Sequence, residues 1–290
     1  MRQIITFITV LSFGLVFGQA CGGLTSINYN GHTYELVEIG SQCWFKDNLG
    51  TLLYKDGTHI NYHSTDYAAW QQSTAGAYAW YDNDSASYDS IYGKLYNWYA
   101  VNNSAGLCPT GWHVPSDSDW IILETYLENN GYNYDGSTSG KKYVKAMADT
   151  LYWTSSTNTG AVGNNDYPSY RNKSGLSLLP SGERTSGGFY NDLGDRGYWW
   201  SSSQYNSSTA WKRELKYNFS GGLLRGGEVY NTGFSVRCLK DTGAIQTLMN
   251  EYDILNINIY PNPFTTSTTI ELLSEPHILT IYDIVGNKVR

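Results

Sequence analysis

The chain has 290 residues, enough for one large domain and a smaller one, and a formal net charge of -7. Its hydrophobic fraction of 41% allows a substantial core, while charged residues make up only 16%. The acidic balance argues against nucleic acid as a partner, because neutralising phosphates requires a basic face. A chain rich in Tyr, Asn, Ser and Gly with so few charges has the composition of an extracellular protein.

The N-terminus has the pattern of a secretory signal peptide over residues 1–20. An apolar run over residues 4–17 is followed by the small residues Gly18 and Ala20. The run is too short for a good membrane span, so we expect cleavage after Gly18 or Ala20. Lipidation of Cys21 is the alternative, although Gly18 stands where a lipid-attachment motif usually has an aliphatic residue.

Four cysteines, an even number in an exported chain, predict disulfide bonds. They form no CxxC pair, which argues against a zinc knuckle or a thioredoxin-like site. Of the three pairings available, we favour Cys21 with Cys43 and Cys108 with Cys238. The second bridge closes a long loop, and loop-closure entropy gives it about 4–5 kcal/mol of stabilisation.

The first half of the chain alternates short strands with polar loops. Residues 27–48 predict strands, with a hairpin turn around Asn30 and Gly31. Residues 62–90 predict a loop held by aromatic anchors. Residues 92–101 are apolar and aromatic, and their periodicity fits a strand or a helix equally well.

The most convincing helix in the mature chain is predicted over residues 120–127. Ser116 is suited to cap it, and Asp119 three residues later completes an approximate capping box. Apolar residues then recur at helical spacing, at Trp120, Leu123 and Leu127. We expect this segment to be a packing centre of the fold and not a reaction centre.

The second half is predicted to be rich in strands. A short helix is expected over residues 141–147, and strands are expected at residues 176–179, 198–203, 211–217 and 233–239. Residues 242–255 have the composition of a linker. Beyond it, residues 256–290 predict a second unit with alternating strands at 268–272 and 279–283.

Seven segments of the chain follow one another in the order of a known secreted family. They are IGSQCW (39–44), DNL (47–49), DGT (56–58), YGKLYNWYAV (92–101), CPTGWHVP (108–115), GYWWSS (197–202) and GFSVRC (233–238). Residues 21–241 therefore resemble the Fibrobacter succinogenes major paralogous domain. The resemblance implies an α+β, C-type-lectin-like fold, related to the sulfatase-modifying factors. Such a domain has twisted antiparallel strands, few short helices and long loops.

Residues 256–290 resemble a different family. The segments YPNPF (260–264) and LTIYDIVGNKV (279–289) are similar to the C-terminal sorting domain of the type IX secretion system. The resemblance implies a β-sandwich tail, export by the type IX machinery, and a location at the bacterial surface, peripheral to the outer membrane. Such domains normally contain several more strands, so we expect a partial sandwich here.

Aromatic residues suggest a binding surface near the last strands. Trp199 and Trp200 are adjacent in a predicted strand and so must face opposite sides, which predicts one in the core and one on the surface. A stacking surface for sugar or peptide would add nearby loop residues, namely Tyr190, Tyr205, Trp211, Arg225 and Tyr230. The alternative is that most of these side chains belong to the core.

Asp82, Asn83, Asp84 and Asp89 offer the oxygen ligands that calcium prefers, and calcium is the one cofactor for which the sequence offers a candidate site. They lack the spacing of an EF-hand, and the chain lacks the Glu-Pro-Asn or Gln-Pro-Asp signature of calcium-dependent lectins. The alternative is a turn rich in Asx residues.

The leading hypothesis is a secreted or surface-displayed binding domain without enzymatic activity, which recognises glycans. One alternative is an enzyme, either a formylglycine-generating-type oxidase or a glycosidase. The oxidase needs a cysteine pair late in the domain, where only Cys238 stands, and the glycosidase would draw on Glu183, Asp192 and Asp195. The other alternative is a structural envelope protein with no small ligand.

Overall fold

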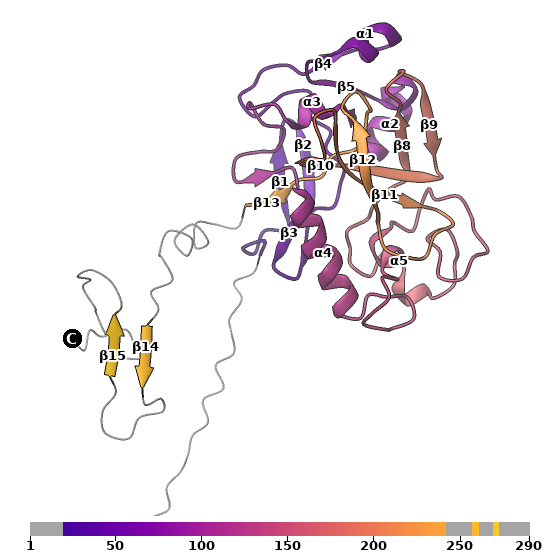
Figure 1. The fold of residues 1–290 in the computed structure, drawn as a ribbon. Coiled ribbons are helices and arrows are strands. Elements are labelled where there is room, and N and C mark those ends of the chain that lie inside the picture. Colours follow the sequence, from indigo (N-terminus) through magenta and orange to yellow (C-terminus); the bar gives the residue numbers. More distant parts are fainter. Residues whose placement is uncertain (1–19, 242–256, 261–268, 273–290) are drawn as a thin grey trace, which may run out of the picture. The chain divides into compact units, whose positions relative to one another are not determined.

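The computed structural model describes residues 20–241 and two further strands, residues 257–260 and 269–272 (Figure 1). The chain divides into two compact units, Met1–Asp241 and Thr242–Arg290. Apart from Ala20, the predicted signal peptide lies outside the described residues, as does the predicted linker, 242–255. Within the described part of the chain, no helix has the length and apolar character needed to cross a bilayer.

The first unit is an α+β fold of short strands, few helices and long loops, as predicted. Its strands are β1 (Ser26–Tyr29), β2 (His32–Ile39), β3 (Gln42–Phe45), β4 (Asn61–Tyr62), β5 (Ala77–Ala79), β6 (Leu95–Tyr96), β7 (Trp112–His113), β8 (Ser181–Arg184), β9 (Tyr190–Leu193), β10 (Arg196–Gln204), β11 (Thr209–Lys216), β12 (Leu224–Val229) and β13 (Leu239–Lys240). Its helices are α1 (Tyr67–Gln72), α2 (Ser85–Tyr92), α3 (Trp98–Val101), α4 (Asp117–Asn129) and α5 (Val144–Met147), with 3₁₀ turns η1 (Tyr81–Asn83) and η2 (Pro168–Tyr170).

One sheet has the strand order β1-β2-β3-β13-β7. The predicted turn joins β1 to β2, and Asn30 and Gly31 both have positive φ angles, 48° and 81°, as the tightest hairpin turns require. Strand β13 lies between β3 and β7, with Leu239 opposite Trp44 on one side and His113 on the other. The last strand of the first unit is therefore paired with two strands from much earlier in the chain.

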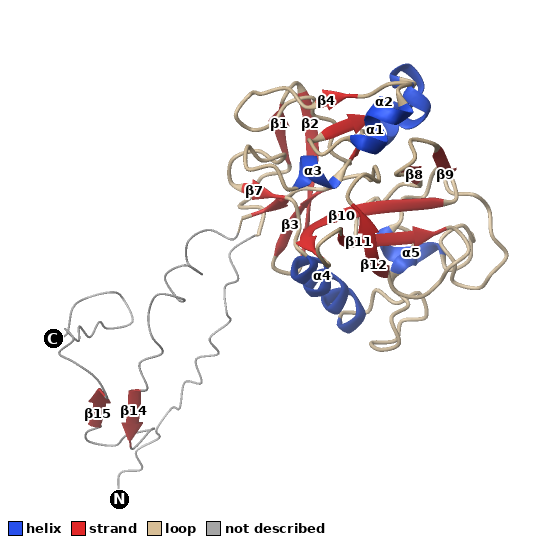
Figure 2. Cartoon of the chain, turned by 45° about the horizontal axis from the view of Figure 1, so that its top comes forward, coloured by secondary structure: helices blue, strands red, loops and turns tan. Residues whose placement is uncertain are grey.

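A second sheet has the order β12-β11-β10-β8-β9, and its pairs are antiparallel except β8 with β10. Helix α4 lies against β10 in this sheet (Figure 2). A small third sheet, β4-β5-β6, completes the unit. The predicted strands over residues 198–203 and 211–217 are confirmed as β10 and β11.

Helix α4 begins with the capping box that the sequence predicts. The Ser116 side chain accepts a hydrogen bond from the Asp119 backbone, and the Asp119 carboxylate accepts one from the Ser116 backbone at 2.8 Å. Trp120 is fully buried, as are Leu123 and Leu127, and its ring lies 4.9 Å from that of Trp44. The helix extends beyond the predicted 120–127 at both ends.

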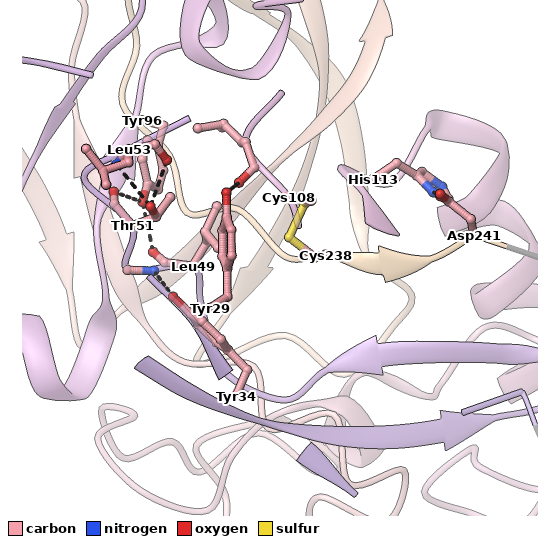
Figure 3. The surroundings of a disulfide bond; sticks show 12 residues. Tyr29, Tyr34, Leu49, Thr51, Leu53, Tyr96, Cys108, His113, Cys238 and Asp241 are labelled. Carbon is pink, nitrogen blue, oxygen red and sulfur yellow. Dashed lines mark hydrogen bonds and ion pairs between the residues drawn. A yellow bond between two sulfur atoms is a disulfide. The ribbon is translucent and has the colours of Figure 1, made fainter. Parts of the chain in front are cut away.

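Disulfides join Cys21 to Cys43 and Cys108 to Cys238, the pairing that the sequence favours. The second bridge spans 130 residues and ties the segment before β7 to the segment before β13 (Figure 3). Near it, the Tyr29 hydroxyl donates to the carbonyl of Leu107 at 3.0 Å. The two bridges indicate an oxidising, extracellular type of environment.

Two predicted strands are wrong or much shorter than expected. Residues 176–179 contribute one bridge, between Ala148 and Leu178, because Ser177 has a positive φ of 53° that no regular strand accommodates. Residues 233–239 make isolated bridges to three other segments before β13 begins at Leu239. Residues 233–239 form a buried connection from the second sheet to the first.

Helices are present in two segments that carry no clear helix signal in the sequence. Segment 62–90, predicted as a loop, contains α1 and α2. Segment 92–101, for which the sequence allowed a strand or a helix, contains both: the short strand β6 is followed by helix α3. The predicted helix over 141–147 is confirmed in its last turn as α5.

In the second unit, the described residues form one antiparallel pair, β14 (Ile257–Tyr260) with β15 (Thr269–Leu272). Strand β15 confirms the strand predicted at 268–272. The strand predicted at 279–283 lies outside the described residues.

Candidate binding surface

Tyr205 in the turn between β10 and β11, Trp211 on β11 and Arg225 on β12 form one cluster, which we call the Trp211 platform. The guanidinium carbon of Arg225 lies 3.5 Å from the centroid of the Trp211 ring. The ring of Tyr205 meets Trp211 edge to face, with 4.4 Å between the ring centroids. Tyr205 is 51% exposed, and the side chain of Arg225 is 40% exposed. These two residues therefore present the polar and aromatic contact groups of the platform.

The register of the hairpin explains why these side chains meet. Trp211 pairs with Gly227, and Arg213 pairs with Arg225, so Trp211 and Arg225 are diagonal neighbours on one face. Gly227 leaves the space opposite Trp211 open. A Cβ atom there would lie 2.5 Å from the Tyr205 ring, so only glycine allows Tyr205 to take this position.

Asp117, the first residue of α4, holds Arg225 in place. Arg225 donates from Nε and Nη2 to the two carboxylate oxygens of Asp117, at 2.8 and 2.6 Å, and Arg213 donates from Nη1 at 2.8 Å. Burial alone would raise the pKa of Asp117, but the bonds from Arg225 and Arg213 outweigh it and hold that pKa below its usual value. The platform is therefore braced by a buried ion-pair network at the start of a helix.

A groove of about 260 Å³ begins at Arg225 and runs between α4 and β12. Its floor includes the buried side chains of Tyr143 and Leu223. The Tyr143 hydroxyl donates to Glu124 at 2.7 Å, which fixes one polar wall. Glu128 and Lys141 belong to the same lining. Arg225 belongs to both the platform and the groove, which makes them one continuous surface.

Trp199 and Trp200 correct the expectation that one of the two faces solvent, because both are fully buried. Strand β10 is central in its sheet, and each of its faces is covered by a separate hydrophobic cluster. Trp199 donates from Nε1 to the Asn48 side chain at 3.0 Å, and Trp200 donates to the Tyr96 carbonyl at 2.7 Å. They are core residues and take no part in a surface.

Tyr190 and Tyr230 also have internal roles. Tyr190 is on β9, at the opposite edge of the sheet from β12, and its hydroxyl donates to Asn83 at 2.9 Å. Tyr230 stacks on Trp98 with 4.5 Å between centroids, and its hydroxyl donates to the Asn206 carbonyl at 2.9 Å. Tyr230 thus supports the turn that carries Tyr205, whereas Tyr190 lies apart from the platform.

Three of the four predicted calcium ligands are engaged in contacts within the fold. Asp84 caps helix α2 by accepting from the Ser87 backbone at 3.0 Å, and Asp89 pairs with the buried Lys94 at 2.8 Å. Asn83 accepts the hydroxyl of Tyr190. Among the described residues, no three His, Cys, Asp or Glu side chains gather closely enough to hold an ion.

Glu183 and Asp192 lie on the paired strands β8 and β9. Burial, and next the charge of Asp192, raise the pKa of Glu183 to about 7. Asp192 accepts the Tyr198 hydroxyl at 2.6 Å and lies 3.8 Å from Arg196. The pair combines a carboxyl that is protonated near neutral pH with a carboxylate held in a polar network.

Asp117 and Gly227 are the parts of this surface that the sequence analysis missed. The sequence did not single out Asp117, because the helix dipole alone already accounts for an acidic residue in the first turn of a helix. The signal available was Arg213 in the middle of a predicted strand, because a positive charge that becomes buried there requires an acidic partner.

A family model described as the Fibrobacter succinogenes major domain matches residues 37–240. This range includes every residue of the Trp211 platform and of the groove. No curated protein matches the chain. No solved structure matches it either.

Proposed function

Because the chain belongs to the Fibrobacter succinogenes major domain family, we propose that residues 21–241 form a binding domain without enzymatic activity that recognises glycans. The proposal includes a C-type-lectin-like arrangement of the two sheets. The observation that carries it is the Trp211 platform, an exposed aromatic and guanidinium surface that opens into a groove.

The chemistry of the platform suits sugars. The exposed ring of Tyr205 can cover the apolar face of a sugar ring, since aromatic rings contribute large contact area at low entropic cost. Arg225 uses Nε and Nη2 to hold Asp117, and its Nη1 makes no hydrogen bond within the described residues. That group is available to sugar hydroxyls, and its position is fixed before a ligand arrives.

We extend the proposal to the route of export. The second unit acts as a sorting domain of the type IX secretion system and delivers the protein to the bacterial surface, peripheral to the outer membrane. The two disulfides and the β14–β15 hairpin are consistent with this route. The test is to delete residues 242–290 in a host with type IX secretion, which should leave the protein in the periplasm.

The binding proposal is tested with the full chain on a glycan array and on insoluble polysaccharides, with calcium and with chelator. We expect selective binding that Tyr205→Ala weakens by at least about tenfold. Tyr152→Ala is the matched control, because Tyr152 is equally exposed, at 50%, and lies outside the platform. Absence of binding to every glycan tested, or equal loss in both variants, would contradict the proposal. Loss with chelator alone would point to calcium.

A glycosidase is the second candidate, favoured by the raised pKa of Glu183 beside Asp192. A protonated carboxyl near an ionised one is the arrangement that glycoside hydrolysis uses. Release of reducing sugar that Glu183→Gln abolishes would establish it.

The oxidase hypothesis loses support, since that chemistry needs free thiols and all four cysteines are in disulfides. The platform also favours ligand binding over a purely structural role.

A further inference from the structure

A separate cavity of about 330 Å³ shares no residue with the platform or its groove. It is walled by the beginning of β2, the segment after β3 and the last turn of α2. Its volume is at the lower end of the range found for small-molecule sites. The lining is predominantly polar, with hydroxyl, imidazole and carboxyl groups from these three elements.

Tyr34 supplies an unsatisfied donor in this cavity. Its side chain is only 2% exposed, and its hydroxyl oxygen accepts a hydrogen bond from the Gly50 backbone at 3.0 Å. The hydroxyl proton has no acceptor among the described residues. A buried donor left without a partner is costly, so a ligand oxygen that accepts this proton gains binding free energy.

The charges around the cavity favour a cation. Three carboxylates line it, those of Glu35, Asp47 and Asp89, whereas no Lys or Arg side chain does. Glu35 pairs with Lys46 at 2.5 Å and Asp89 pairs with Lys94 at 2.8 Å.

Asp47 differs from the other two carboxylates. It accepts the Glu35 backbone N–H at 3.2 Å and has no cationic partner in the described part of the chain. Asp47 is therefore the carboxylate of the cavity that makes no direct ion pair, although the charge of the buried Arg237 also acts on it.

The Tyr34 hydroxyl and the carboxylates of Asp47 and Asp89 belong to the same cavity. Burial raises the pKa of Tyr34 to about 12, and the negative charges of Asp47 and Asp89 add to that shift. Both carboxylates line the same cavity as Tyr34, and the Tyr34 hydroxyl keeps its proton at neutral pH. A ligand in the cavity therefore meets a hydroxyl donor, from Tyr34, and negatively charged carboxylates.

We propose that this cavity binds a small amino sugar, with its ammonium group at Asp47 and a hydroxyl oxygen accepting from Tyr34. An amino sugar carries both groups on one compact ring, and its remaining hydroxyls match the polar walls. The site does not depend on the Trp211 platform, so it can be tested independently of glycan recognition at the platform.

The test is isothermal titration of the full chain with glucosamine, glucose and N-acetylglucosamine. Glucosamine is expected to bind at least about tenfold more tightly than the other two, because only it carries the ammonium group that pairs with Asp47. Asp47→Asn should weaken glucosamine binding about tenfold or more, and Tyr34→Phe should weaken it about fivefold. Asp82→Asn, which removes an exposed carboxylate outside the cavity, should change nothing.

Equal affinity for glucosamine and glucose would overturn the proposal, and so would absence of glucosamine binding at millimolar concentration. The comparison of the three sugars uses the unaltered protein, so it stays decisive even where Asp47→Asn fails to fold. Tyr205→Ala should leave glucosamine binding unchanged. That variant separates failure of this site from failure of the platform.

Discussion

Arg237 donates from Nε to the side chain of Asn48 at 2.7 Å, although the two residues are 189 positions apart. The Arg237 side chain is fully buried, and none of its hydrogen-bond partners is a carboxylate. Burial lowers its pKa to about 10, so it still carries its charge at neutral pH. Its other partners are backbone carbonyls from two distant segments, those of Phe45, Lys46, Leu176 and Ser177.

Arg237→Met keeps the length of the side chain but removes all of these donors. We expect it to lower the free energy of unfolding by about 3 kcal/mol or more, because it leaves several buried acceptors unpaired. For a domain of this size, that is a fall in Tm of roughly 6–12 °C. Arg171→Met is the control, since Arg171 is partly exposed and donates to one carbonyl, that of Thr150. A loss no larger than in the control would show that Arg237 is not a structural clamp.

The two disulfides should differ in what their removal costs. The Cys108–Cys238 bridge spans 130 residues and the Cys21–Cys43 bridge spans 22. Loop-closure entropy then gives about 5 kcal/mol for the first and about 3.4 kcal/mol for the second. Urea unfolding of the two double Cys→Ala variants should show the larger loss for Cys108 and Cys238. The reverse order would mean that residual structure in the unfolded chain dominates.

Local signals in the sequence were sufficient where one segment determines its own structure. The capping box of Ser116 and Asp119 and the turn at Asn30 and Gly31 are set by groups within four residues of each other. The disulfide pairing that we favoured among the three possible ones, with one short loop and one loop across the domain, is the one present. The strands β10 and β11 were visible from their residue types.

The sequence did not predict what depends on the second sheet as a whole. That Trp199 and Trp200 are both buried follows from coverage of both faces of β10, which neighbouring residues do not encode. The binding surface likewise depends on the register that sets Gly227 opposite Trp211. The contact of Asp117 with Arg225 joins residues 108 positions apart.

His113 should make stability depend on pH. Its hydrogen bond with Asp119 is the main cause that raises its pKa above the usual value, against burial, and Asp241 adds to the effect. Its Nε2 lies 3.2 Å from the Asp119 carboxylate. Its Nδ1 lies 2.6 Å from the Asp241 carboxylate (Figure 3). A raised pKa in the folded state gives stabilisation that is complete below about pH 6.5 and is lost as the pH rises through the folded value.

We therefore expect the free energy of unfolding to fall as the pH rises above about 6.5. Glu183, with a pKa raised to about 7, adds a loss of the same sign from about pH 4.5 upward, so the variant His113→Gln is needed to isolate the histidine. That variant should flatten the profile above pH 6.5, whereas His59→Gln, at an exposed position, should leave it unchanged. Denaturant midpoints at several pH values give the profile. An identical slope in His113→Gln would rule out this bridge as its source.

In the proposed exported form of the protein, Cys21 should carry no lipid. Its sulfur is bonded to Cys43, and a thioether to an acyl-glycerol group would need the same sulfur. Its backbone nitrogen donates to the Glu38 carboxylate at 3.1 Å. After cleavage following Ala20, this nitrogen becomes an ammonium group, and the contact with Glu38 becomes a charge-assisted hydrogen bond.

Mass spectrometry of peptides from the non-reduced exported protein should therefore show Cys21 linked to Cys43, with no acyl mass. Glu38→Gln should cost the processed protein about 0.5–1 kcal/mol, because the ion pair is partly exposed. Lys46→Gln is the control, since it breaks a surface ion pair that does not involve the new terminus. Incorporation of labelled palmitate, or a free thiol at Cys43, would mean that the lipid displaces the bridge. In that case the pairing of β1 with β2 would have to hold the N-terminal segment without the bridge.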